Sequence, residues 1–279
     1  MKKLEFISDK NEKISNLLLE KGFSYNSVSR LLRNKDVRVD GVKISSNINV
    51  CEGCSIIVFY DESMIKTEQN IDIVYQDDNI IVAGKPQGIE VEGESGVAKK
   101  LNAYAVHRLD RNTTGLMVLS KNLQAKSELD KAFKNRTLTK KYIAEVVGSA
   151  DFKGEKYKAY LLKDANKSQV KIYNKKVAGS SEITTIFKTL KSSPTSSVVE
   201  CTLVSGKTHQ LRAHLAFLGH PIIGDGKYGR NEDNKKFKKK YQQLHCYYLK
   251  FDGLDGTLNY LNGKEFVLMP SFYNFNKDF

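Results

Sequence analysis

The stretch that decides the fold is HRLDRNTTGLMVLSKN, residues 107–122. It places one carboxylate, Asp110, between Arg108 and Arg111, and continues through a polar turn into an apolar run that is typical of a buried strand. A carboxylate held among cations stays ionised at neutral pH. Asp110 could therefore be half of an ordinary ion pair that braces a strand end, or a nucleophile at the mouth of a basic cleft.

The sequence around this stretch is strongly basic. Lys and Arg exceed Asp and Glu by 45 to 32 in the 279 residues, so the formal net charge is +13. Residues 99–141 carry a net charge of +8 (11 basic, 3 acidic), and residues 227–240 carry +5 (7 basic, 2 acidic). Such an excess favours a polyanionic partner, nucleic acid or an anionic membrane surface, although a basic protein without one is the simpler alternative. Each basic segment lies beside a candidate motif, which favours a surface that follows phosphates, but the run 235–240 (KKFKKK) could be only a solvated loop.

Composition and the N-terminus narrow the class of protein. Hydrophobic residues make up 40% of the chain and proline only 4 positions, which indicates a folded protein. The opening MKKLEFISDKNEK lacks the apolar stretch of a signal peptide, and no run approaches the roughly 18 apolar residues of a membrane span. We therefore expect a cytoplasmic protein without a membrane partner. CEGC (51–54) has the spacing of half a zinc site, but no second pair follows closely, and we interpret it as a turn between two strands.

The periodicity divides the chain into three parts. Residues 1–60 show two short amphipathic helices, a hairpin and a further strand, which predicts a small α/β module; Arg30 and Arg33 point away from the apolar stripe of its second helix. Residues 61–70 are polar and aperiodic, as in a linker. Residues 71–279 hold many strands and two helical patterns, which predicts an α+β domain with a mixed, mostly antiparallel sheet and flanking helices. Its expected strands are 71–76, 79–84, 115–120, 141–148, 157–162, 182–190, 196–204, 245–251 and 265–269.

Two further motifs contain side chains that a plain strand or helix does not need. GKPQG (84–88) fits a type I turn that starts at Lys85, and it is either a simple strand end or the lining of a site. SGKTHQLRAHLAFLGHPIIGDGKYG (205–229) predicts a helix with Arg212 in an otherwise apolar segment. A buried arginine needs a carboxylate partner, and Asp110 is a candidate.

Other chemistries fail on spacing. His209 and His214 stand five residues apart, and so on different faces of a helix, which does not suit a shared metal ion of a hydrolase. SGKT (205–208) lacks the first glycine of a phosphate-binding loop, and neither G-x-S-x-G nor a dinucleotide fingerprint occurs. We therefore expect no metal and no cofactor, and we expect His107, His209 and His214 chiefly to fix loops.

Five motifs together resemble those of one enzyme family. HRLDRNTTG, GKPQG, KKYIAEVVG, the 205–229 motif and LHCYYLKF are similar, in the same order, to motifs of pseudouridine synthases of the ribosomal large-subunit type, the RluA-like family. They extend across residues 71–251. The first 60 residues resemble the RNA-binding module named for ribosomal small-subunit protein four, which is often fused ahead of this catalytic domain.

The resemblance implies an RNA uridine isomerase that flips its target out of the RNA and acts most often on large-subunit (23S) ribosomal RNA. It makes Asp110 the catalytic aspartate, Tyr142 the aromatic that packs on the flipped uracil, and Arg212 the partner of the aspartate. Arg108 belongs to the motif that enters the duplex when the base leaves. We expect further RNA contacts from Arg111, Lys85, Lys207, His209, Arg30 and Arg33.

The sequence departs from the family pattern at a few positions: Thr114 for Ser, Lys207 for Arg, Gly84 for Asn, and Glu92 near a frequent His. None of these changes affects the three catalytic positions. Alternatives remain for single residues, since Tyr142 could be plain core and Arg212 purely structural. For the whole protein, the alternative is a non-catalytic RNA-binding or ribosome-assembly factor of the same fold. We expect a monomer whose partner is ribosomal RNA or transfer RNA.

Overall fold

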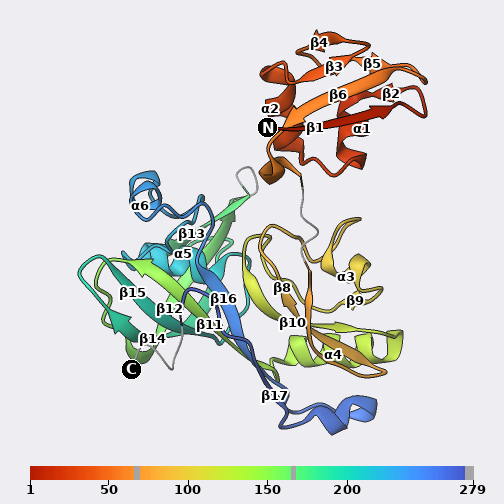
Figure 1. The fold of residues 1–279 in the computed structure, drawn as a ribbon. Coiled ribbons are helices and arrows are strands. Elements are labelled where there is room, and N and C mark those ends of the chain that lie inside the picture. The colour runs from red at the N-terminus through yellow and green to blue at the C-terminus, as the bar shows by residue number, and fades with distance from the viewer. Residues whose placement is uncertain (66–69, 165–167, 274–279) are drawn as a thin grey trace. The chain divides into compact units, whose positions relative to one another are not determined.

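The structure, a computed structural model, describes residues 1–65, 70–164 and 168–273. The chain forms two compact units, Met1–Asn70 and Ile71–Phe279, and each is described by itself (Figure 1). Among the described residues, no helix has both the length and the apolar character required to cross a membrane.

The first unit is a small α/β module. Its elements are β1 (Lys2–Ile7), β2 (Glu12–Lys13), α1 (Ile14–Glu20), α2 (Tyr25–Arg33), β3 (Val37–Val39), β4 (Val42–Ile44), β5 (Asn49–Val50) and β6 (Ser55–Tyr60). Four strands form an antiparallel sheet in the order β1-β6-β3-β4, and β2 pairs with β5. The apolar faces of both helices and of the sheet share one core, which includes Leu18, Leu31 and Ile56. The predicted helices and hairpin are therefore present.

Local signals set the ends of these elements. α1 ends where Gly22 adopts φ +89°, and the Phe23 N–H donates to the Leu18 carbonyl at 3.1 Å, an arrangement common at helix C-termini. Asp40 and Gly41 both have positive φ, which matches the twist of the hairpin that they connect. The hairpin formed by β3 and β4 was predicted from the sequence, and it is confirmed.

The segment that we predicted as a linker, 61–70, begins as part of the first unit. Glu62–Met64 forms the short 3-10 helix η1, and Met64 is 6% exposed within the first unit's core. Residues 66–69 of the predicted linker lie outside the described residues. The packed part of the first unit therefore extends past residue 60.

The second unit is built on one large sheet. Its strands are β7 (Asp72–Gln76), β8 (Ile80–Lys85), β9 (Tyr104–Ala105), β10 (Thr114–Ser120), β11 (Thr139–Val147), β12 (Lys153–Asp164), β13 (Gln169–Tyr173), β14 (Ser181–Ser192), β15 (Ser196–Leu203), β16 (Leu244–Lys250) and β17 (Glu265–Val267). Their order is β13-β12-β14-β15-β11-β16-β10-β8-β7, with β9 on β10 and β17 on β16. The recorded pairs are antiparallel except for β10 with β16, so the predicted mixed, mostly antiparallel sheet is confirmed.

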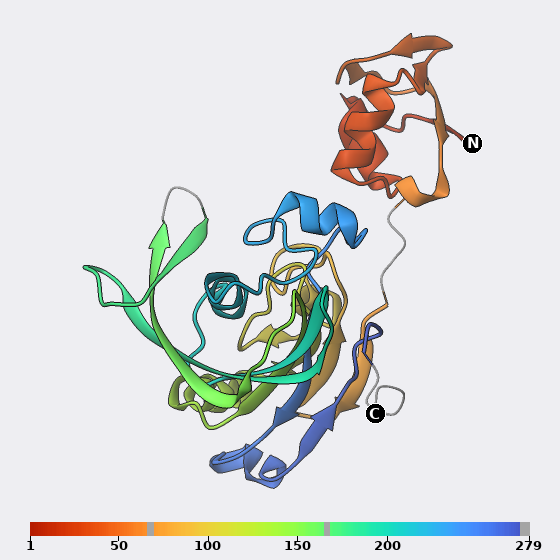
Figure 2. The same cartoon turned by 90° about the vertical axis from the view of Figure 1, so that its left-hand side faces the viewer.

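Helices accompany this sheet, as expected for an α+β domain. They are α3 (Val97–Lys100), α4 (Leu123–Asn135), α5 (Gln210–Phe217), α6 (Asn231–Lys236) and the 3-10 helix η2 (Gly256–Leu261). Figure 2 shows strands of the sheet curving around α5, which is seen nearly end on. Leu211 and Leu215 of α5 belong to the main core, and Ala213 packs with residues of β12, β13 and β14. The curved sheet therefore buries α5 on more than one side.

The parallel pair of β10 and β16 places the loop that contains Asp110. Gly115, near the start of β10, has φ +103°, and a Cβ atom there would lie 2.2 Å from the Cys246 carbonyl oxygen. Only glycine permits so close an approach at this dihedral angle. The loop 107–113 therefore enters β10 at a fixed point, beside β16 near the middle of the sheet.

Candidate active site

A cavity of about 400 Å³ lies where the loop 107–113, β11 and the start of α5 meet. This is within the size range of sites that hold a small organic group. Its lining includes six of the ten residues that the sequence predicted for the site: Arg108, Asp110, Tyr142, Lys207, His209 and Arg212. The fold therefore brings together residues that are separated by about a hundred positions in the sequence.

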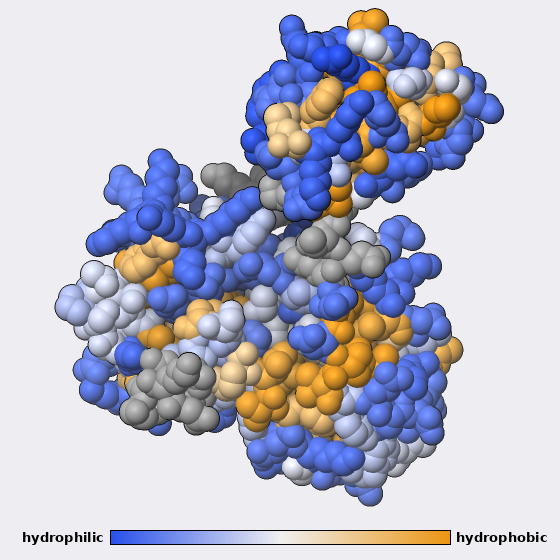
Figure 3. All heavy atoms as spheres, viewed as in Figure 1, coloured by the Kyte–Doolittle hydropathy of each residue, from blue (hydrophilic) through white to orange (hydrophobic). Residues whose placement is uncertain are grey.

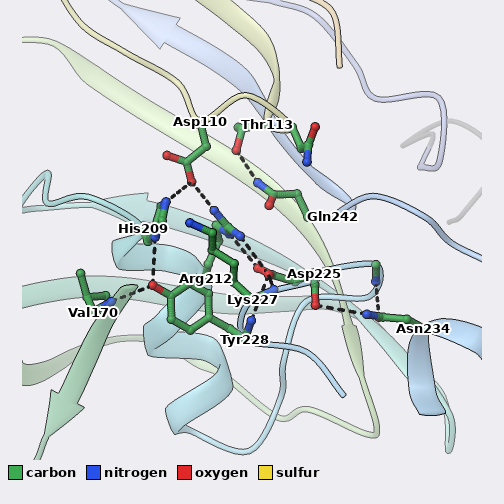
Figure 4. A network of polar contacts seen from close by, with 12 residues as sticks. Asp110, Thr113, Val170, His209, Arg212, Asp225, Lys227, Tyr228, Asn234 and Gln242 are labelled. Atoms are coloured by element: carbon green, nitrogen blue, oxygen red, sulfur yellow. Dashed lines mark hydrogen bonds and ion pairs between the residues drawn. The ribbon is translucent and has the colours of Figure 1, made fainter. Parts of the chain in front are cut away.

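Arg212 of α5 holds two carboxylates at once (Figure 4). Its Nη1 donates to Asp110 Oδ2 at 2.8 Å, while Nε and Nη2 donate to the two oxygens of Asp225 at 2.7 and 2.9 Å. Burial lowers the pKa of Arg212. The hydrogen bonds and charges of Asp225, and then those of Asp110, outweigh burial and raise this pKa above its ordinary value, so the guanidinium stays charged. The predicted pairing of Arg212 with Asp110 is present, and Asp225 supplies the stronger, two-pronged half of the arrangement.

Asp225 is the anchor of this arrangement. It is fully buried, and its Oδ1 also accepts the backbone N–H groups of Lys227 and Tyr228 at 2.8 and 3.1 Å. Burial raises the pKa of Asp225, but the hydrogen bonds and the charge of Arg212, with these N–H groups, outweigh burial and lower it overall. Asp225 is therefore ionised, and it fixes both Arg212 and the loop that follows.

A residue of α6, Asn234, forms hydrogen bonds with the loop that contains Asp225. The side chain of Asn234 accepts the Gly224 N–H at 2.7 Å and donates to the Asp225 carbonyl at 3.1 Å. Gly224 has φ +81°, and a Cβ atom there would lie 2.0 Å from the Tyr241 carbonyl oxygen. The first glycine of GDGKYG, Gly224, is thus required by a close approach of backbone to backbone.

Asp110 itself is only partly covered. Its side chain is 18% exposed, and the contacts recorded for its carboxylate, from Arg212 and from His209, both fall on Oδ2. His209 Nε2 lies 3.8 Å from that oxygen. Oδ1 therefore remains available to a molecule in the cavity. Neither flanking arginine pairs with this carboxylate: Arg108 is exposed, and Arg111 donates to the Gly88 carbonyl at 3.0 Å.

The turn at Lys85 braces the Asp110 loop. Lys85 is 1% exposed, and its ammonium donates to the carbonyls of Pro86, Ile89 and Arg111 at 2.7–2.9 Å. Burial lowers the pKa of Lys85 to about 8, and the charge of Asp110 opposes this shift. We predicted an RNA contact for Lys85, but a buried ammonium with three carbonyl partners cannot reach a phosphate. The geometry assigns it to holding the loop backbone instead.

Tyr142 forms the floor of the cavity. It is 4% exposed, and it lies on β11 opposite Cys201 of β15 and Cys246 of β16. Burial raises the pKa of Tyr142 well above its ordinary value, so the phenol stays neutral. A neutral aromatic ring in an apolar wall can stack on a base.

His107 and His214, which we expected to fix loops or to contact backbone, both contact residues of strands, in β10 and in β14. His107 accepts the Val118 N–H on Nε2 at 3.0 Å, and the His214 ring bonds with the Thr185 hydroxyl at 3.1 Å. Burial lowers the pKa of both histidines, so they are neutral at pH 7. Across residues 1–65, 70–164 and 168–273, no three His, Cys, Asp or Glu side chains are grouped so as to hold a metal ion.

Basic residues are also exposed outside the cavity. Lys207 is exposed beside the start of α5, and α6 with the residues after it carries the exposed lysines Lys235, Lys236, Lys238, Lys239 and Lys240. Figure 3 shows that hydrophilic side chains cover α6. In the first unit, Arg30 and Arg33 are exposed on α2. These residues are available for the predicted RNA contacts.

Sequence reasoning missed two residues of the site. These residues are Asp225 and Tyr228, and neither was among the residues predicted for the site. The signal for both was the glycine-rich GDGKYG, because a single acidic residue between glycines, following a helix with a buried arginine, indicates a second partner for that arginine. Their contacts with Arg212 and His209 are shown in Figure 4.

Comparisons with known sequences all find RNA pseudouridine synthases. A profile of the family described as RNA pseudouridylate synthase matches residues 79–217. An uncharacterised RNA pseudouridine synthase of Mycoplasma pneumoniae is 30% identical over 87% of this chain and 83% of that protein. The ribosomal large subunit pseudouridine synthase C of Buchnera aphidicola is 30% identical over 82% of this chain and 81% of that protein. The ribosomal large subunit pseudouridine synthase D of Neisseria meningitidis is 31% identical over 78% of this chain and 62% of that protein.

Solved structures agree on the fold. The human protein named RNA pseudouridylate synthase domain containing 4 has a TM-score of 0.57 at 24% identity, over 72% of this chain and 89% of that chain. The human protein named RNA pseudouridylate synthase domain containing 1 has a TM-score of 0.60 at 21% identity, over 74% and 94%. At this level of identity, the two structures establish the fold alone.

Proposed function

The chain belongs to the RNA pseudouridylate synthase family, and from this premise we propose that it isomerises uridine in large-subunit ribosomal RNA with Asp110 as its nucleophile. Family membership makes the chain an isomerase that acts on RNA. The observation that supports Asp110 as the nucleophile is its position at the cavity. Arg212 and His209 both contact its Oδ2, and neither of them contacts Oδ1. The choice of ribosomal RNA rests on the names of the relatives, synthases C and D.

The chemistry needs a carboxylate and a closed space, and the cavity offers both. Asp110 attacks C1′ of the flipped-out nucleotide, the N1–C1′ bond breaks, and the freed uracil turns while the cavity holds it. C5 then attacks C1′ and displaces the Asp110 carboxylate, C5 loses its proton, and N1 gains one, so that product and substrate are isomers. Arg212 holds the Asp110 carboxylate in place through Oδ2, and Tyr142 stacks on the base.

The rest of the molecule binds the RNA around the target. Arg108 and Lys207 at the cavity contact the flanking phosphates, and Arg30 and Arg33 contact RNA from the first unit. The exposed Arg111 can add a contact through the part of its guanidinium that Gly88 leaves free. The protein works as a cytoplasmic monomer without a cofactor. Transfer RNA is the other target class that mapping of the product would reveal.

Replacement of Asp110 by Asn tests the assignment. The amide keeps the size of the side chain and a hydrogen-bond acceptor for Arg212, but it is not a nucleophile. We expect the rate of pseudouridine formation on ribosomal RNA to fall by at least about four orders of magnitude. Release of tritium from RNA labelled at uridine C5 measures the rate, and filter binding measures affinity, which should change little.

The matched control is Asp130→Asn on α4, an exposed aspartate that pairs only with Lys126 in the described contacts. It should keep the full rate. If Asp110→Asn still forms pseudouridine at a rate near that of the unchanged protein, Asp110 is not the nucleophile. If no RNA is modified by the unchanged protein while binding persists, the non-catalytic assembly factor becomes the better assignment.

A further inference from the structure

His209 is placed to touch the same carboxylate as Arg212. It caps the start of α5 with φ +53°, its side chain is only 12% exposed, and it lines the cavity. Its Nε2 lies 3.8 Å from Asp110 Oδ2. Such positive φ is uncommon outside glycine and marks a residue whose surroundings determine its conformation.

The other ring nitrogen of His209 meets a tyrosine. The Tyr228 hydroxyl lies 2.9 Å from His209 Nδ1, and it accepts the backbone N–H of Val170 at 2.9 Å (Figure 4). A phenol has one hydrogen to donate. The hydroxyl oxygen accepts from Val170, and among the described contacts His209 Nδ1 is the acceptor within reach of the hydroxyl hydrogen.

Tyr228 is itself held firmly. Its backbone N–H donates to Asp225 Oδ1 at 3.1 Å, and the guanidinium of Arg212 lies over its ring, 5.3 Å from the centroid. Val170 belongs to β13, the outermost strand of the sheet. The hydroxyl is thus fixed from two directions, by the Asp225 loop and by the sheet edge.

His209 is neutral at pH 7. Burial lowers its pKa, Arg212 and Lys227 lower it further, and the charges of Asp110 and Asp225 oppose these effects. A neutral imidazole carries one N–H. With Nδ1 accepting from Tyr228, that hydrogen lies on Nε2, on the side of Asp110.

We propose that Tyr228 is a positioning residue of this active site: its hydroxyl selects the tautomer of His209 with hydrogen on Nε2, which directs an N–H at the Asp110 carboxylate. The proposal rests on the proposed role of Asp110. His209 and Arg212 then address one oxygen, and Oδ1 is left to the substrate. At 3.8 Å the His209 contact is longer than a hydrogen bond, and such contacts often shorten when substrate binds.

The tautomer can be measured directly in the full-length protein. Long-range ¹H–¹⁵N correlations of the imidazole rings distinguish the two neutral tautomers, and His209→Gln identifies the His209 signals by their loss. We expect the Nε2–H form in the unchanged protein and a mixture, or the Nδ1–H form, in Tyr228→Phe. An Nδ1–H form in the unchanged protein, or an unaltered Nε2–H form in Tyr228→Phe, overturns the proposal.

Kinetics supply the second measurement. Tyr228→Phe keeps the ring under Arg212, so we expect kcat to fall about tenfold with KM within about twofold. His209→Gln presents an amide N–H near the position of Nε2 and should retain most of the rate, whereas His209→Ala should lose it. Adding Tyr228→Phe to His209→Gln should change nothing more, and a further loss of rate means that the hydroxyl acts by another route.

The control is Tyr241→Phe, which removes a hydroxyl from a tyrosine that is 38% exposed, and it should leave both the tautomer and the rate unchanged. The two proposals fail separately. If Asp110→Asn remains active, the role of Asp110 fails, whatever tautomer is found. If Asp110→Asn is inactive and the tautomer does not depend on Tyr228, the positioning role alone fails.

Discussion

Arg212 divides its guanidinium unequally between two carboxylates. The buried Asp225 takes two hydrogen bonds, and the partly exposed Asp110 takes one, on a single oxygen. A carboxylate gripped by two donors on both oxygens would be a poor nucleophile. The unequal division lets Asp225 fix the arginine while Asp110 keeps one reactive oxygen.

Replacement of Asp225 by Asn should therefore damage both stability and rate. Removing one charge from a buried ion pair typically costs about 3–5 kcal/mol, and here it would also release Arg212 from its anchor. We expect a free energy of unfolding lower by that amount, and a rate of isomerisation lower by at least about tenfold.

Urea denaturation and tritium release measure these two effects, with Asp110→Asn as the comparison. That variant removes a charge that is 18% exposed, so its loss of stability should be much smaller. Equal stability losses in the two variants would contradict the anchoring role of Asp225.

Two buried histidines give the stability a defined pH dependence. Burial lowers the pKa of His214 and of His245 to about 4, whereas an unfolded histidine titrates near 6.5. Between these values the unfolded state binds more protons than the folded state, so stability falls as pH falls from 6.5 to 4. Each histidine contributes on the order of 2–3 kcal/mol to this loss.

Urea midpoints at pH 7, 6 and 5 test this dependence. His245→Gln keeps a donor for the Leu268 carbonyl but does not titrate, so its midpoint should depend less on pH than that of the unchanged protein. The same pH dependence in both proteins would show that other groups dominate this window.

The sequence predicted which residues belong to the site better than it predicted the contacts between them. Asp110, Tyr142 and Arg212 stand in motifs, and the structure brings all three to one cavity. The pairing of Arg212 with Asp225, and the burial of Lys85, depend on loops that meet only when the sheet is complete. The spacing of the motifs does not determine these contacts, and GDGKYG indicates only that the arginine has a second partner.

Among the elements, α6 connects the site to the basic surface. Asn234 ties it to the loop of Asp225, and the lysines from Lys235 to Lys240 follow on the exposed side. The run could be only a solvated loop, as its composition allowed. Its attachment to the site loop instead favours a contact with the RNA that enters the cavity.

Exchange of Lys238, Lys239 and Lys240 for Gln tests this contact. If these lysines meet phosphates, the triple variant binds RNA more weakly, and the slope of log affinity against log salt concentration becomes shallower by roughly two. The value of kcat should not change, because none of the three lines the cavity.

The matched control exchanges three exposed lysines of β12, Lys153, Lys156 and Lys158, for Gln. They lie toward the end of β12 away from the residues that pair with β13. An equal change of slope in both triple variants would mean that charge alone, and not the position of α6, determines binding.

Elements with a clear apolar pattern were predictable, and two elements without one were not. All nine predicted strands of the second unit overlap observed ones, because alternating apolar residues mark half-buried strands and continuous apolar runs mark buried strands such as β8 and β10. β13 and α6 were not predicted. β13 is a five-residue edge strand that packs on α5, and α6 has no buried residue to set a periodic pattern. Their formation depends on tertiary contacts rather than on local preference.

In the whole molecule, we expect the second unit to perform the reaction and the first unit to contribute to RNA binding. The cavity and its ion pairs belong to the second unit, and the exposed Arg30 and Arg33 belong to the first. Deletion of residues 1–70 should raise KM for ribosomal RNA by roughly tenfold, through lost phosphate contacts, and leave kcat near its original value.

Steady-state kinetics measure both constants, and the full chain with Arg30→Glu and Arg33→Glu is the companion variant. It should raise KM in the same direction without altering the length of the chain. An unchanged KM in both proteins would refute an RNA-binding role for the first unit.

The contacts of the site also determine when the enzyme can first act. Asp110 meets Arg212 across 102 positions of sequence, and Val170 meets Tyr228 across 58. Contacts of such long range form late in folding, after the chain between them has collapsed. During synthesis, Asp110 leaves the ribosome well before Arg212 and Tyr228. With Asp110 in the role proposed above, a nascent chain is therefore inactive until the whole of the GDGKYG loop has emerged and docked.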